Sequence, residues 1–236
     1  MNKLLVAFDT ETTGVDPKTA EVVQLAAVSM CPFSLDMNVV FNQLSYPASG
    51  VIPKEASEVH GIYFEDLLFQ PRDSDSIAAF VALLFVKGLE NEVILITYNG
   101  RTYDVPVIER HAPSICTYRH IDVYQIVQRT EALFTHGLKL GAVYHGLFKK
   151  ELKGAHEAVS DVVATLEVFQ ECLKTLGMTI DQLIDWLDTP QILETCYFGK
   201  HAGVKFCDVP KGYLRWVKNN WTELTPDMKL TLETYI

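Results

Sequence analysis

The stretch Leu4-Leu5-Val6-Ala7-Phe8-Asp9-Thr10-Glu11-Thr12-Thr13-Gly14 joins an apolar run to an acidic, polar turn. An apolar run of this length, bounded by polar residues, predicts a buried strand. Residues two apart on a strand point to the same face, so the carboxylates of Asp9 and Glu11 are expected to converge. Two like charges about 4 Å apart repel by roughly 4 kcal/mol at an effective dielectric of about 20. The pair therefore indicates a bound cation or a solvated position, and Gly14 allows backbone to come close to a ligand.

The composition sets broad limits on the class of protein. The 236-residue chain is 48% hydrophobic, enough for one sizeable domain or a domain with a small appendage. No apolar run approaches the ~18 residues of a membrane span, so we expect no membrane association, and no signal peptide is recognisable. The five cysteines include no CxxC pair, which predicts reduced thiols and a cytoplasmic location. The net charge of −10 argues against a general nucleic-acid coat protein, but not against an enzyme with metal-neutralised carboxylates.

The spacing of apolar residues predicts an α/β fold, a mixed sheet with helices packed on it. Strands are expected at residues 3–8, 21–30, 35–44 and 93–98, with the first three as an antiparallel meander. Helices are expected near residues 77–88 and at 104–111, 122–133, 138–147, 157–177 and 179–187, and a last one from Thr225-Pro226. Residues 1–188 are expected to form one domain, and residues 189–236 a small appended module with an aromatic cluster.

Two later segments carry further acidic candidates. Asn99 ends a buried strand, and Asp104 follows at the expected start of a helix, where helix capping is the simpler interpretation. Asp161 lies one turn into a strongly amphipathic helix, and its small neighbours leave room for a ligand. His156 reaches Asp161 only if it lies on the preceding loop; a surface aspartate and a loop histidine are the alternative. Asp122 is expected to cap a helix rather than to bind a metal.

Taken together, these residues form a set with a recognisable chemistry. Carboxylate oxygens suit Mg²⁺ or Mn²⁺ better than zinc. A pair of such ions can clamp a phosphodiester at both its attacking and its leaving oxygen. A histidine beside them is a natural general base, because its pKa lies near neutral pH. The candidate set is Asp9, Glu11, Asp104, His156 and Asp161.

The set resembles the DEDDh (DnaQ-like) 3′→5′ exonuclease superfamily. Asp9-x-Glu11 is similar to its first motif, Asn99-x-x-x-x-Asp104 to its second and His156-x-x-x-x-Asp161 to its third. The tail from Phe198 onward resembles the C-terminal module of the exodeoxyribonuclease X group. The resemblance implies a ribonuclease-H-like fold, two Mg²⁺ or Mn²⁺ ions per site, and release of nucleoside 5′-monophosphates from DNA 3′ ends.

The resemblance also implies roles for individual residues. Asp9, Glu11 and Asp161 would hold one metal ion, with Asp9 bridging to a second. Asp104 would hold the second ion through water, and His156 would activate the attacking water. Residues of the turn after the first strand and of the loop Val59-His60-Gly61-Ile62 would contact the 3′-terminal nucleotide. The expected substrate contacts are Thr12, Thr13, Gly14, His60, Ile62 and Asn99. Ordinary core packing of Ile62 and a simple strand-end turn at Asn99 are the alternatives.

Three functions remain open at this stage. The first is a 3′→5′ DNA exonuclease acting on single-stranded or duplex ends, and the second is a 3′→5′ exoribonuclease that trims RNA. The third is a catalytically inactive module that binds nucleic acid, which the complete set of chemically competent residues disfavours. The aromatics and lysines of the tail suit single-strand binding or a small core, and the core is favoured. A replication or repair protein bound through the tail is a further candidate partner.

Overall fold

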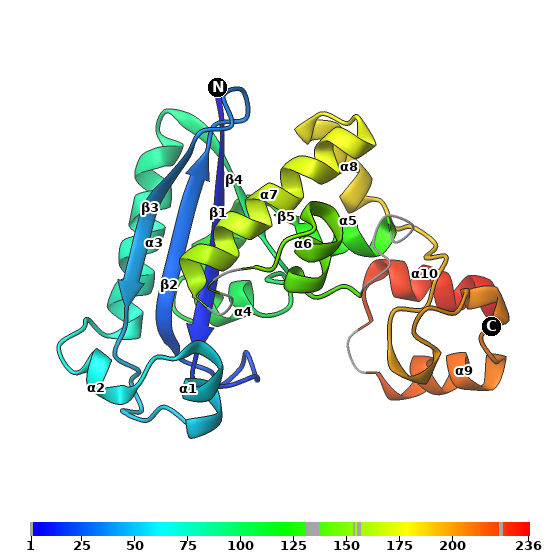
Figure 1. Cartoon of the computed structure of the whole chain (residues 1–236), viewed down its shortest axis with the longest axis horizontal. Helices are drawn as coiled ribbons and strands as arrows, with labels where there is room; N and C mark the ends of the chain where they lie inside the picture. The colour runs from blue at the N-terminus through cyan, green and yellow to red at the C-terminus, as the bar shows by residue number, and fades with distance from the viewer. Residues whose placement is uncertain (1, 131–136, 153, 155–156, 222–223) are drawn as a thin grey trace.

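The fold is built around a five-stranded mixed sheet. The computed structural model spans residues 1–236 and describes all of them except 1, 131–136, 153, 155–156 and 222–223. The sheet order is β3-β2-β1-β4-β5, with β1, β2 and β3 antiparallel and with β4 and β5 parallel to β1 (Figure 1). The strands are β1 Asn2–Thr12, β2 Val22–Met30, β3 Met37–Leu44, β4 Asn91–Thr97 and β5 Arg119–Asp122.

Helices cover both faces of this sheet. Within the described residues they are α1 Lys54–His60, α2 Phe64–Leu67, α3 Asp73–Gly88, α4 Asp104–Glu109, α5 Val123–Arg129, α6 Leu140–Phe148, α7 Ala158–Leu176, α8 Ile180–Asp188, α9 Lys211–Asn220 and α10 Pro226–Tyr235. Short 3-10 turns are η1 Pro113–Thr117, η3 Gly199–His201 and η4 Phe206–Asp208. None of the helices in these described ranges is long and apolar enough to cross a membrane. The expected cytoplasmic location stays a prediction.

Successive side chains of β1 point to opposite faces of the sheet, and this determines which helix each of them contacts. Leu5 and Ala7 belong to the core that includes Val162 of α7. The alternate residues Val6 and Phe8 pack on the opposite face against α3. Asp9 and Glu11 continue the Leu5–Ala7 face, because side chains two apart on a strand share a face. The two carboxylates therefore project toward α7, which crosses that face of the sheet in Figure 1.

The predicted mixed sheet with packed helices is confirmed, and several element bounds are corrected. The sequence pattern did not reveal β5, α1 or α2, which are four, seven and four residues long, or helix α9 in the tail. The helix expected at 122–133 begins at Val123 and ends at Arg129 within the described residues. Periodicity needs about 11 residues to separate a helix from a strand, so short elements leave little signal.

The C-terminal segment has a hydrophobic cluster of its own. Its buried residues are Leu193, Cys196, Phe206, Val209, Leu214, Val217, Met228 and Leu232. Six of the tail's aromatics serve this core: Phe206 belongs to the cluster, and Tyr197, Phe198, Tyr213, Trp221 and Tyr235 pack against it. The core interpretation of these aromatics is therefore confirmed, whereas Trp216 is 53% exposed. In Figure 1, α9 and α10 lie beyond α5 and α6, away from the sheet.

A buried ion pair fixes the C-terminal segment to the rest of the chain. Arg129 at the end of α5 donates to both carboxylate oxygens of Asp227, at 2.7 and 2.8 Å. The Arg129 guanidinium also donates to the backbone oxygens of Trp186 and Leu187, and it lies 4.9 Å from the ring centroid of Trp186. The two charged side chains are only 3% and 5% exposed. Four acceptors thus satisfy one buried guanidinium at this junction.

Candidate active site

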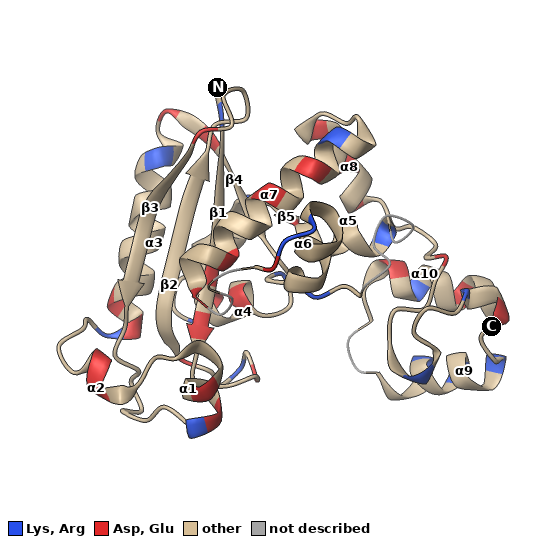
Figure 2. Cartoon of the chain, viewed as in Figure 1, with Lys and Arg blue, Asp and Glu red and all other residues tan. Residues whose placement is uncertain are grey.

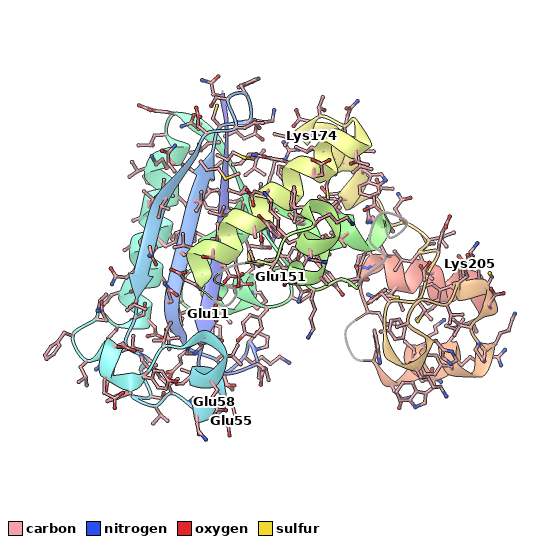
Figure 3. The ribbon with its side chains drawn as sticks, in the orientation of Figure 1. Glu11, Glu55, Glu58, Glu151, Lys174 and Lys205 are labelled. Atoms are coloured by element: carbon pink, nitrogen blue, oxygen red, sulfur yellow. The ribbon has the colours of Figure 1, made fainter. Side chains whose placement is uncertain are left out.

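Three carboxylates from two elements meet at the end of β1. Ligand oxygens of Asp9, Glu11 and Asp161 all lie within 4.8 Å of one another. Asp161 stands in the first turn of α7, whose amphipathic face packs on β1 and brings this carboxylate over the strand end. Figure 3 shows Glu11 at the end of β1 beside the start of α7, and Figure 2 shows the acidic segments of both elements together.

The electrostatics of this cluster favour protons or a bound cation. Burial and then the charges of Asp161 and Asp104 raise the pKa of Glu11 from 4.5 to about 8. Burial and then the neighbouring carboxylates, that of Asp104 first, hold the pKa of Asp9 well above its usual value. Both shifts arise because ionised carboxylates that are desolvated and close together repel one another. A divalent cation placed among them would offset the repulsion and release the protons.

The structure places Asp104 beside the cluster but outside the three-carboxylate group. Asp104 is the first residue of α4, and its Oδ1 accepts hydrogen bonds from the backbone nitrogen and hydroxyl of Thr10 at 3.0 and 2.5 Å. Burial raises the pKa of Asp104 to about 6, while the bonds from Thr10 act in the opposite direction. Thr10 lies on the face of β1 opposite to Asp9, so this end of the strand is acidic on both sides.

The turn after β1 is held by a residue of the second acidic segment. The Thr12 hydroxyl donates to the backbone oxygen of Gly14 at 2.9 Å and is hydrogen-bonded to the Tyr103 hydroxyl, which also bonds the Gly14 oxygen. Thr13 is hydrogen-bonded twice to the backbone of Glu21. Its backbone nitrogen donates to the Glu21 backbone oxygen, and its hydroxyl accepts from the Glu21 backbone nitrogen. The expected substrate turn is therefore preorganised by bonds within the chain.

Asn99 and Asp122 form a second fixed turn at the end of β4. Asn99 has a left-handed backbone, with φ of 62°. Asp122 accepts from the backbone nitrogens of Asn99 at 2.7 Å and Arg101 at 3.0 Å. It also accepts from the Tyr124 nitrogen at 3.1 Å, which confirms that Asp122 caps α5. The strand-end turn expected at Asn99 is thus present, and a phosphate contact by its side chain stays a prediction.

The loop expected to hold the 3′-terminal nucleotide follows α1. His60 is the last residue of that helix, and its Nδ1 accepts from the backbone nitrogen of Ile62 at 3.0 Å. Ile62 is 9% exposed and packs with Val23 and Leu67. The structure therefore shows the core packing that was the alternative for Ile62, and its contact with a terminal base stays a prediction. His156, the expected general base, lies outside the described residues.

Several supporting residues were not singled out as site residues from the sequence. Thr10 and Tyr103 hold Asp104 and the turn after β1, and Asp122 holds the turn after β4. Gly100 is also constrained, because a Cβ there would lie 2.8 Å from Asp104 Oδ2 and 2.6 Å from Thr97 Cβ. For Thr10, the alternation of side chains along β1 is a signal in the sequence, because it places Thr10 at the same strand end as Asp9 and Glu11 but on the opposite face. The contacts of Tyr103 and Gly100 depend on distant parts of the chain and leave no local pattern.

The donor set fits a hard divalent cation. Within the described residues, Asp9, Glu11 and Asp161 form the group that offers ligand atoms at suitable separations, and all three offer oxygen. Mg²⁺ and Mn²⁺ prefer oxygen ligands, and Mg²⁺ is commonly held by a few carboxylates together with substrate phosphates and water. The elevated pKa values of Asp9 and Glu11 agree with this, because a nearby cation would stabilise their ionised forms.

Comparisons with known proteins point in one direction. A family model described as an exonuclease, RNase_T, matches residues 6–169. Exodeoxyribonuclease 10 of Escherichia coli K12 is 34% identical over 84 residues, covering 34% of this chain and 38% of that protein. DNA polymerase III subunit epsilon of Treponema pallidum is 26% identical over 171 residues, covering 69% of this chain and 73% of that protein.

Solved structures share the fold at lower sequence identity. E. coli exonuclease I in complex with a dT13 oligonucleotide superposes with a TM-score of 0.63 at 20% identity, covering 79% of this chain and 44% of that one. Exonuclease I of Methylocaldum szegediense gives a TM-score of 0.61 at 22% identity, covering 78% of this chain and 42% of that one. The matches to exodeoxyribonuclease 10 and to both exonuclease I chains span less than half the length of those proteins.

Proposed function

Because the chain belongs to the RNase_T family of exonucleases, we propose that it hydrolyses DNA from the 3′ end and releases nucleoside 5′-monophosphates. The observation that carries the proposal is the group formed by Asp9, Glu11 and Asp161, whose ligand oxygens lie within 4.8 Å of one another. The likeness to exodeoxyribonuclease 10 and to the polymerase III epsilon subunit, both named for DNA, favours DNA as the substrate.

Each residue of the site receives a role in this proposal. Asp9, Glu11 and Asp161 would hold a divalent cation, Mg²⁺ or Mn²⁺, and Asp104 would contribute to a second one. Such ions supply positive charge to the attacking and leaving oxygens of the phosphodiester. Thr10 orients the Asp104 carboxylate through its two hydrogen bonds.

Proton transfer falls to His156, by resemblance to the third motif of the superfamily. His156 takes the proton from the attacking water, whose oxygen bonds to phosphorus while the phosphorus bond to the 3′ oxygen breaks. The departing 3′ oxygen takes a proton from solvent, so the products are a nucleoside 5′-monophosphate and a DNA strand with a new 3′ hydroxyl.

The terminal nucleotide is proposed to lie against the turn Thr12-Thr13-Gly14. The bonds from Tyr103 to this turn support the role, because a fixed turn costs little ordering when a ligand binds. His60, Ile62 and Asn99 are proposed to contact the 3′ end from the loop after α1 and the turn after β4. Residues 1–188 are proposed to form the exonuclease domain and residues 189–236 a separate module, which the segment's own hydrophobic cluster supports.

The substrate and polarity are tested with four labelled oligonucleotides. Single-stranded DNA and RNA, each labelled at the 3′ or the 5′ end, are incubated with the protein and Mg²⁺. We expect the 3′ label of DNA to appear at once as mononucleotide, while the 5′-labelled strand shortens one nucleotide at a time. Shortening of RNA alone would favour the exoribonuclease, and absence of product with Mg²⁺ and with Mn²⁺ would favour a binding module.

A further inference from the structure

A large cleft connects the acidic site to the C-terminal segment. Its volume is about 1500 Å³. Asn99 and Asp161 line it at the end that belongs to the candidate active site, and Ala202, Gly203 and Lys205 line it from the C-terminal segment. The cleft therefore leads from Asp161 to residues that lie outside the matched exonuclease region.

Positive charge is placed along this route in an otherwise acidic protein. Lys139 and Lys205 line the cleft from opposite parts of the chain, and both are exposed. Residues 189–236 carry six Lys or Arg and five Asp or Glu, whereas residues 1–188 carry 14 and 25. The C-terminal segment thus has a net charge of +1 and the remainder −11, so a polyanion is repelled least on the C-terminal side. Figure 3 shows Lys205 on the surface of that segment.

The C-terminal segment carries a row of three aromatic rings, His201, Tyr213 and Trp216. His201, next to the cleft residue Ala202, lies 4.6 Å from the Tyr213 ring, centroid to centroid. Tyr213 stacks on Trp216 at 5.9 Å with an angle of 19° between the rings, and Trp216 is 53% exposed. Lys200 Nζ lies 5.5 Å from the Tyr213 ring centroid. Aromatic rings next to cations are the usual surface for stacking unpaired bases.

Two features hold this row in place. Gly199 has a φ of 60°, and a Cβ there would collide with the Tyr213 hydroxyl, so the turn η3 packs directly on Tyr213. The buried pair of Arg129 and Asp227 fixes α10 to α5. The C-terminal segment that carries the ring row is therefore attached to α5 by a buried contact as well as by the chain itself.

We propose that single-stranded DNA leading to the active site runs through this cleft and continues along the row His201–Tyr213–Trp216, where one base stacks on the exposed ring of Trp216. The inference rests on the proposed DNA exonuclease function and extends it to a binding site for nucleotides upstream of the 3′ end. Lys139 and Lys205 contact the phosphates on the way, and the open face of Trp216 takes a base at the far end. Single strands suit this route, because paired bases offer no free face to the rings.

The test measures DNA affinity in an Asp9→Ala background, so that the DNA is not degraded. Fluorescein-labelled oligothymidylates of about 4 and about 16 nucleotides, which bracket the usual site size of a single-strand-binding fold, are titrated by anisotropy. We expect Trp216→Ala to weaken binding of the longer strand at least about five-fold, the effect of losing one stacked base. The loss for the shorter strand is expected to be smaller, because a short strand does not reach Trp216.

A second variant tests the phosphate contact by its salt dependence. Lys205→Gln is expected to lower the slope of log affinity against log salt by about 0.7, the value for one phosphate contact on a single strand. Phe69→Ala and Lys174→Gln are the matched controls, since Phe69 is 97% exposed near α2 and Lys174 lies 65% exposed near the end of α7. Both controls are expected to bind both oligonucleotides as the Asp9→Ala parent does.

Two outcomes separate failure of this inference from failure of the proposed function. If Trp216→Ala and Lys205→Gln bind the longer strand like the controls while wild-type protein degrades it, the route is wrong and the exonuclease stands. The exposed row would then be assigned to a protein partner. If wild-type protein neither binds nor degrades either strand, the proposed function and the route fail together.

Discussion

Asp104 Oδ1 accepts two hydrogen bonds from Thr10, one from its backbone nitrogen at 3.0 Å and one from its hydroxyl at 2.5 Å. Thr10 lies between Asp9 and Glu11, so one strand end both supplies two carboxylates and orients a third from α4. The bonds favour the ionised form of Asp104 against the burial that raises its pKa to about 6. Thr10 is thus a positioning residue of the proposed metal site.

The first prediction concerns the Thr10 hydroxyl. Thr10→Val removes one bond to the ionised carboxylate, so the pKa of Asp104 is expected to rise above about 6. Carboxyl NMR titration of the metal-free protein measures the pKa, and the Mg²⁺ concentration for half-maximal hydrolysis is expected to increase. Thr234→Val is the control, because the Thr234 hydroxyl bonds only the Leu230 oxygen on α10 among the described contacts. An unchanged pKa and Mg²⁺ requirement would remove Thr10 from the site.

The second prediction concerns the space beside Asp104. Gly100→Ala places a methyl group 2.8 Å from Asp104 Oδ2 and 2.6 Å from Thr97 Cβ, so the carboxylate must move. A displacement of about 1 Å can cost about 100-fold in rate. We therefore expect a large loss of kcat, while the melting temperature changes little. Gly88→Ala is the control, because its methyl group would meet no heavy atom within 4 Å and its φ is not left-handed. Equal rates for the two variants would contradict the constraint.

The third prediction concerns pH and stability without metal. The folded protein holds the Glu11 proton up to about pH 8, whereas an unfolded glutamate loses it near 4.5. The unfolded state therefore binds fewer protons in this window, and the free energy of unfolding falls as pH rises, by at most about 1.4 kcal/mol per pH unit for one proton. Burial lowers the pKa of His120 from 6.5 to about 3. Between these two pH values the unfolded state binds more protons at His120 than the folded state, so this group makes the free energy of unfolding rise with pH.

Urea unfolding between pH 7.5 and 8 isolates the carboxylate effect. This range lies about one pH unit or more above the unfolded pKa of His120, 6.5, and far above its folded pKa of about 3, so His120 is largely neutral in both states. Glu11→Gln is expected to flatten the decline of stability with pH. Mg²⁺ is expected to stabilise the wild-type protein more at pH 8 than at pH 6.5, since fewer protons compete for the carboxylates. Equal slopes for the wild type and Glu11→Gln would show that Glu11 ionises normally.

The fourth prediction concerns the junction with the C-terminal segment. Arg129→Met leaves the Asp227 carboxylate buried without its cation, which costs about 3–5 kcal/mol for a buried pair. Urea unfolding followed by tryptophan fluorescence measures the loss. Arg119→Met is the control, because Arg119 is 38% exposed and its ion pairs with Glu92 and Asp181 are worth about 0–1 kcal/mol. Equal losses for the two variants would contradict a special role for the buried pair.

Strand alternation explains why the acidic cluster and the central sheet were predictable. Asp9 and Glu11 are two apart on a strand, and the long apolar stripe of α7 fixes where Asp161 lies, so local patterns carry both facts. Four-residue β5 is too short for periodicity, although its pairing with β4 places Asp122 at the turn after that strand. The bonds of Thr10, Tyr103 and Asp122 join residues far apart in sequence, and no single-segment pattern reports them.

The tail was predictable in part for the same reason. Its mixture of aromatics and lysines fits both a small core and a stacking surface, and composition does not separate the two. Burial does, because Phe198, Phe206 and Trp221 pack into the C-terminal cluster while Trp216 stays 53% exposed. The ion pair of Arg129 and Asp227 spans 98 positions, so its role as a clamp follows only from the folded chain.

The most direct measurement on the metal site is the rate at which Asp9→Ala releases labelled mononucleotide from 3′-labelled single-stranded DNA with Mg²⁺. Asp75→Asn, an exposed aspartate in the first turn of α3, is the control. We expect no measurable release by Asp9→Ala, retained DNA binding, and a normal rate for Asp75→Asn. Release by Asp9→Ala at the wild-type rate would contradict a metal-dependent site built on Asp9, Glu11 and Asp161.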